Sequence, residues 1–203
     1  MIDVRPTTPE GVVDLIAARA NASPRRVRLA IDGAPAAAPH DLAALVAVRL
    51  APRPTLHVRA DSFWRQASLR LEQGRANPEA WLDDWLDEAT LCREVLVDFP
   101  STGIALPALR DPDTDRSIRA ARVTLPPDGI VIVSGSVLLG RGLPFDVTVH
   151  VWLSTAAQAR RTPPDEAWIL PALERYDRER DPVGVADLVV RSDDPRHPAV
   201  VVA

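Results

Sequence analysis

Short apolar runs alternate along the chain with segments whose apolar positions follow helical spacing. The runs typical of buried strands are residues 27–32, 55–60, 129–135, 146–154 and 186–190. Helical spacing is predicted after Thr8, through 42–50, from 77 to 95, over 155–161 and from 162 to 176. This order is typical of parallel strands joined by helices. We therefore predict one α/β domain over residues 1–203, a three-layer α/β/α sandwich with a mostly parallel sheet. The run at 186–190 is predicted to close the sheet, with an irregular tail until 200–202.

Composition excludes several chemistries. All 24 basic residues among the 203 are arginines, so Schiff-base chemistry, a lysine base and a phosphate-binding lysine are ruled out. A net charge of −4 argues against a nucleic-acid partner, which would need a basic face. A single cysteine, Cys92, allows neither an internal disulfide nor a zinc site built from cysteines.

Hydropathy points to a cytoplasmic protein without a membrane partner. The N-terminus lacks a basic segment followed by an apolar run, and no stretch of about 18 apolar residues occurs.

Small and polar residues follow the predicted strands, where a parallel α/β sheet binds its ligands. They are Gly33, Asp61, Ser134 and Gly135. Residues 33–40 also stand between a strand and a helix, in the frame of the phosphate-binding loop GxxxxGK[ST]. Of that pattern the chain keeps only the first glycine, and the last three positions hold Ala38, Pro39 and His40.

Several further segments, in order, resemble the uridine–cytidine kinases among the P-loop nucleoside kinases. Asp61-Ser62-Phe63-Trp64-Arg65 is similar to their D-S-F-Y-R, and 77–84 (NPEAWLDD) to their H-P-D-A-F-D. Ser134-Gly135 stands in the place of their Glu-Gly. Phe145-Asp146 and the strand after it, then Ala159-Arg160-Arg161, resemble the segments that precede their lid, and 186–190 resembles their last strand. The series spans residues 27–190.

The resemblance implies a P-loop fold with a small helical lid at about 155–181, and it assigns roles. Asp61 would accept the proton of a nucleoside 5′-hydroxyl, and Arg160 and Arg161 would stabilise the transferred phosphoryl group. Asp83 or Asp84 would face the ribose, and Arg65 belongs to the same substrate-binding segment. Gly33, Ala38, Pro39 and His40 would form the nucleotide-binding loop. Residues 110–116 resemble the family's base-reading segment only roughly.

The implied activity is phosphoryl transfer from an NTP, with ATP and Mg²⁺ as cofactors, to a nucleoside. The departures from the pattern lie on the phosphate-donor side. Pro39 removes both the ammonium group and one backbone N–H, and His40 replaces the hydroxyl that binds Mg²⁺. Loss of one preorganised donor costs about 3–4 kcal/mol of transition-state stabilisation. Arg28, Arg141 and the lid arginines are the candidates for a substitute charge.

Alternatives remain at each position and for the whole chain. Gly33 and Pro39 also suit a plain turn and helix start, and Asp61 a helix cap. The carboxylates after residue 82 also suit a solvated helix face, Arg160 and Arg161 a helix C-terminus, and Trp81 and Trp85 the core. The rival to an active kinase is an impaired pseudokinase that binds a nucleoside or a protein. A third hypothesis is a structural partner without a ligand.

Overall fold

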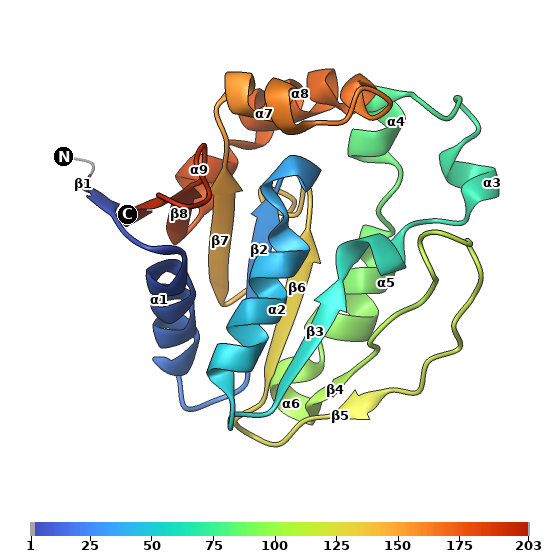
Figure 1. Ribbon diagram of the computed structural model, residues 1–203. Coiled ribbons are helices and arrows are strands. Elements are labelled where there is room, and N and C mark those ends of the chain that lie inside the picture. The colour runs from blue at the N-terminus through green and yellow to red at the C-terminus, as the bar shows by residue number, and fades with distance from the viewer. Residues whose placement is uncertain (1–2, 203) are drawn as a thin grey trace.

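The computed structural model of the chain describes residues 3–202 and contains one seven-stranded sheet (Figure 1). Its strands, in spatial order, are β1 (Asp3–Pro6), β9 (Ala199–Val202), β8 (Leu188–Arg191), β7 (Val147–Trp152), β2 (Val27–Gly33), β6 (Ile130–Gly135) and β3 (Thr55–Arg59). The five strands from β8 to β3 are parallel. The predicted α/β fold with a mostly parallel sheet is therefore confirmed.

Two antiparallel strands extend the sheet beyond the expected closing strand. β9 pairs with β8, and β1 pairs with β9. The prediction that residues 186–190 close the sheet was therefore wrong. β1 is only four residues long, too short a run to be recognised from sequence, and its place in the sheet comes from pairing with β9.

Helices cover both faces of the sheet and bury the apolar side chains of its central strands on each face. On one face α1 (Pro9–Asn21) and α2 (Pro39–Leu50) pack against Ile130 and Ile132. On the other face α5 (Glu88–Leu91), the π-helical turn η3 (Cys92–Leu96) and α6 (Phe99–Thr102) pack against Val131 and Val133. Because alternate residues of β6 point to opposite faces and both faces are covered, residues 130–133 are apolar at every position.

The helix predicted from residue 77 to 95 is broken into pieces. Asn77 caps α4 (Pro78–Asp83) as expected, but the chain then leaves the helix. Arg65 donates its backbone N–H to the carbonyl of Trp85, and Asp87 donates to that of Phe63, so residues 85–87 pair with 63–65. The Asp87 side chain then caps α5. This pairing holds Trp85 beside the carboxyl ends of the strands.

The remaining elements connect and cover the sheet. They are the 3₁₀ turns η1 (Pro35–Ala37), η2 (Ala60–Phe63) and η4 (Ala167–Ile169), helices α3 (Ala67–Arg70), α7 (Thr155–Arg161), α8 (Leu170–Arg180) and α9 (Pro182–Val185), and a small sheet of β4 (Ile104–Ala105) and β5 (Val123–Thr124). No helix within residues 3–202 is long and apolar enough to cross a membrane.

The predicted lid region corresponds to α7, η4 and α8. These elements lie across the end of the sheet toward which the parallel strands point, next to α4 (Figure 1). α8 shares an apolar cluster with α4, to which Ala172 and Leu173 contribute from α8 and Trp81 and Leu82 from α4. Ala34, directly after β2, belongs to the same cluster. The lid region is thus packed onto the body of the protein.

Candidate functional site

A cleft of about 530 Å³ opens at the carboxyl ends of β2, β3 and β6. Its walls come from the loop after β2, from η2 after β3, from residues 135–137 after β6, and from α4 and η4. This is the position at which a parallel α/β sheet leaves room for a ligand, because the loops diverge where the strand order reverses. Of the predicted site residues, Ala38, Pro39, His40 and Asp61 line this cleft.

The loop after β2 is closed by its own hydrogen bonds. Ala37 donates its backbone N–H to the carbonyl of Ala34 at 2.8 Å, and Ala38 donates to Pro35 at 2.9 Å. Pro35 and Pro39 have no N–H to offer. Four of the seven backbone positions from 34 to 40 are therefore unable to donate to a bound phosphate. Ala38 adopts a left-handed conformation with φ of 52°, which a glycine would adopt without strain.

Gly33 has a packing role that is independent of any phosphate. A Cβ at this position would lie 2.9 Å from the carbonyl oxygen of Val151 on the neighbouring strand β7. That distance is too short for a methyl group next to backbone. The glycine therefore permits the close approach of β2 and β7 at the end of the sheet.

His40, in the first turn of α2, joins a chain of polar side chains below the cleft. The Ser134 hydroxyl oxygen lies 2.7 Å from Nδ1 of His40 and 2.7 Å from Nε2 of His57. With one proton, this hydroxyl donates to one ring and accepts from the other. Burial, followed by the charges of His40 and Arg59, lowers the pKa of His57 to about 4. Its ring is therefore neutral near pH 7, and the fully buried Ser134 is held between the two imidazoles.

Asp61 is the acidic group at the cleft's polar end. Its Oδ2 lies 3.4 Å from Nε2 of His40, and Arg59 binds both carboxylate oxygens, with 3.1 Å between Nε and Oδ1. Burial acts to raise the pKa of Asp61, but hydrogen bonds from His40 and Arg59 outweigh it and lower the pKa to about 2. Asp61 is therefore ionised at neutral pH, and the guanidinium of Arg59 balances its negative charge.

Four tryptophans form the apolar part of the cleft wall. Trp64 and Trp85 meet edge to face with ring centroids 5.1 Å apart, and Trp168 lies 5.8 Å from Trp85. Trp81 lines the cleft from α4. The guanidinium of Arg70 lies 5.1 Å from the ring centroid of Trp64 and 5.0 Å from that of Trp85. Trp81 and Trp85 are buried, in agreement with the core role considered from the sequence. Both also line the cleft.

Beneath the loop, a buried carboxylate connects β2, β7 and α8. Asp32, fully buried, accepts from the backbone N–H of Leu138 at 2.8 Å and lies 2.7 Å from Nδ1 of His150. The Tyr176 hydroxyl of α8 lies 3.1 Å from Asp32 and accepts from the backbone N–H of Leu139 at 2.9 Å. Burial and the charge of Asp32 raise the pKa of Tyr176 well above its usual value. Asp32 and Tyr176 were not predicted from the sequence. The signal that could have identified Asp32 is a carboxylate near the end of an otherwise mostly apolar strand.

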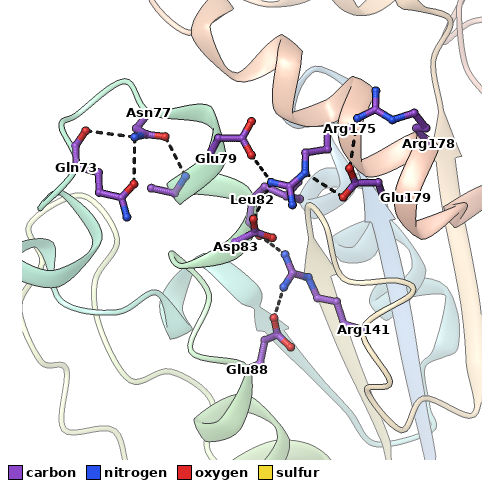
Figure 2. Close-up of polar contacts among 11 residues, drawn as sticks. Gln73, Asn77, Glu79, Leu82, Asp83, Glu88, Arg141, Arg175, Arg178 and Glu179 are labelled. Carbon is purple, nitrogen blue, oxygen red and sulfur yellow. Dashed lines mark hydrogen bonds and ion pairs between the residues drawn. The ribbon is translucent and has the colours of Figure 1, made fainter.

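Arg175 of α8 joins the predicted lid region to α4 by ion pairs. Its guanidinium pairs with Glu79 and, at 2.7 Å, with Asp83 of α4 (Figure 2). Figure 2 also shows Arg141 paired with Glu88. The side chain of Arg141 is almost fully buried. Asp83 therefore takes part in fastening the lid and does not line the cleft.

The other predicted site residues also lie away from the cleft lining. Asp84 is the half-buried residue that follows α4, and Arg65 lines a separate cavity of about 240 Å³. Arg160 is exposed near the end of α7, and Arg161 donates to the backbone carbonyl of Asp193. The structure thus brings together Asp61 and the loop residues, but not Arg65, Asp83, Asp84, Arg160 or Arg161. Their predicted roles stay predictions.

Comparison with known proteins supports the fold through structure alone. No family model and no curated protein matches the sequence. A possible uridine kinase from Bacillus stearothermophilus superposes with a TM-score of 0.72 at 17% identity, over 89% of this chain and 97% of that one. The chain has the fold of a P-loop kinase. A structure from Silicibacter sp. TM1040, named as a fructose transport system kinase, gives 0.54 at 20% identity over 87% and 91%. The YGR205w protein gives 0.57 at 10% identity over 97% and 99%.

The resemblance to uridine–cytidine kinases implies ATP and Mg²⁺, and the loop after β2 lacks the lysine and the hydroxyl that would hold them. Arg59 is the only arginine among the described residues that line the cleft, and it is bound to Asp61. Arg28 pairs with Asp146 and Arg141 with Glu88, so neither candidate substitute faces the loop. Within residues 3–202, no group of three or more His, Cys, Asp or Glu side chains is arranged to hold a metal ion.

Proposed function

We propose that this chain is a nucleoside-binding protein built on a kinase fold, which does not transfer phosphate from a nucleoside triphosphate through its loop. One observation carries the proposal. The acceptor side of the site, a cleft with Asp61 and four tryptophans, is open, whereas the donor side is a loop closed by its own hydrogen bonds.

The open side suits a planar molecule that carries hydroxyl groups. Its volume of about 530 Å³ lies within the range of small-molecule pockets, roughly 300–1,000 Å³. Tryptophan faces stack on aromatic ligands, and each stacked base contributes about 1–3 kcal/mol in proteins that bind nucleic-acid bases. The ionised Asp61 accepts hydrogen bonds from ligand hydroxyl groups.

The closed side argues against catalysis. A P-loop stabilises the transferred phosphate with a lysine, with Mg²⁺ and with several backbone N–H groups. Here the lysine position holds Pro39, and His40 is bonded to Ser134. Each lost donor costs about 3–4 kcal/mol of transition-state stabilisation, so several lost together remove at least a thousandfold in rate.

Isothermal titration calorimetry with uridine, with cytidine and separately with Mg·ATP tests the proposal. We expect the nucleosides to bind and Mg·ATP to give no heat above its dilution. Binding of Mg·ATP together with measurable turnover would overturn the proposal in favour of an enzyme. Binding of neither nucleoside would overturn the proposal and favour the hypothesis of a protein-interaction module.

The position of Asp61 favours one second candidate, a nucleoside phosphotransferase that depends on ATP and Mg²⁺. Asp61 lies in the cleft directly after β3, where the resemblance to uridine–cytidine kinases places the base. If turnover is detected, Asp61→Asn is expected to abolish it. Unchanged turnover in Asp61→Asn would show that Asp61 is not the base.

A further inference from the structure

The charges that line the cleft sum to a negative value. Asp41, Asp61 and Glu166 contribute carboxylates, whereas Arg59 and His40 are the cationic or titratable basic groups among the described lining residues. Because Arg59 is bound to Asp61, that pair is electrically neutral as a unit. The lining is therefore negative whether His40 is neutral or protonated.

Two of these carboxylates form no ion pair within residues 3–202 and come from different walls of the cleft, although the charge of Asp41 also acts on Arg59. Asp41 lies in the first turn of α2, next to the loop that would hold phosphates, and Glu166 lies directly before η4 in the lid region. Both residues are exposed. The negative charge of Asp41 also offsets the positive end of the α2 dipole, which would otherwise attract an anion.

We infer that the cleft selects a planar ligand without negative charge and discriminates against phosphorylated forms of the same ligand, with Asp41 and Glu166 as the specificity-determining residues. The inference rests on the proposed nucleoside binding and narrows it. A phosphate group attached to a ligand in the cleft meets two like charges and a loop with few free N–H donors. Like charge near a binding site rejects a ligand by repulsion, independently of its contacts elsewhere.

The expected discrimination is moderate because the opening is solvated. Both carboxylates are exposed, so their repulsion of a dianion acts through water, and we expect it to lower the affinity by roughly ten- to a hundredfold. Salt screens exposed charges over about 10 Å at 0.1 M and about 3 Å at 1 M, so the ratio should shrink as salt is raised.

Paired titrations with uridine and uridine 5′-monophosphate, followed by calorimetry and by tryptophan fluorescence, test the inference. We expect uridine to bind at least tenfold more tightly than the monophosphate at low salt. The double variant Asp41→Asn/Glu166→Gln should narrow this ratio several-fold, mainly by strengthening monophosphate binding. Asp165→Asn is the matched control, because Asp165 is an exposed neighbour of Glu166 outside the cleft lining, and it should leave the ratio unchanged.

The outcomes separate the inference from the function on which it rests. Equal or tighter binding of the monophosphate, with uridine also bound, overturns the charge selection and leaves nucleoside binding intact. An unchanged ratio in the double variant overturns the role of Asp41 and Glu166. Absence of binding by both ligands overturns the proposed function, and the inference with it.

Discussion

Removal of one hydroxyl group, in Tyr176→Phe, is expected to loosen the lid from the body of the protein. The hydroxyl of Tyr176 reaches from α8 to Asp32 at the end of β2 and accepts the backbone N–H of Leu139. All three groups are buried. Phenylalanine keeps the ring and its packing, so the substitution isolates the hydrogen bonds.

The magnitude follows from what the change leaves behind. The N–H of Leu139 loses its partner in a dry environment, which costs about 1–3 kcal/mol. Asp32 loses one of three bonds, a charged one, but keeps His150 and Leu138. The two effects together lower the free energy of unfolding by about 2–4 kcal/mol, and a domain of this size then melts about 5–15 °C lower.

Urea unfolding followed by circular dichroism measures the loss, and amide hydrogen exchange over 170–180 locates it. Exchange in α8 is expected to rise more than exchange in β6. Glu174→Gln on the exposed side of α8 is the control and should change stability by less than about 0.5 kcal/mol. A Tyr176→Phe protein as stable as the control, with α8 equally protected, would refute the claim that this hydroxyl fastens the lid.

Two further predictions concern His57 and the loop. Because the pKa of His57 is about 4 in the folded protein and about 6.5 when unfolded, the unfolded state binds the proton first, and stability should fall as pH drops from 6.5 towards 4. Urea titrations across this range should show the loss, and His57→Gln should flatten it; an equal slope in the variant would contradict the assignment. Restoring the loop pattern with Ala38→Gly, Pro39→Lys and His40→Thr should create calorimetrically measurable Mg·ATP binding, and no gain would mean that the loop does not correspond to a phosphate cradle.

Much of the scaffold could be predicted from the sequence. The strands form short apolar or alternating runs, of which residues 130–133 are buried at every position, and such runs are recognisable without a structure. Helix starts at Thr8 and Asn77 were equally clear, because a side chain that caps the first turn followed by proline at N1 is a local signal. The break between α4 and α5 could not be predicted from the sequence. Residues 85–87 leave the helix there to pair with residues 63–65, about twenty positions earlier.

For the site, the sequence by itself determined what the loop lacks. A chain without lysine, with Pro39 and His40 in the loop frame, has no phosphate-binding ammonium there in any conformation, because this depends on residue type alone. Only the tertiary structure decided what replaces it: Ser134 between His40 and His57, four tryptophans around one cleft, and α8 fastened to Asp32. The hydrogen bonds of Ser134 and of Asp32 with Tyr176 join residues from 77 to 144 positions apart, and local spacing carries no information at that range.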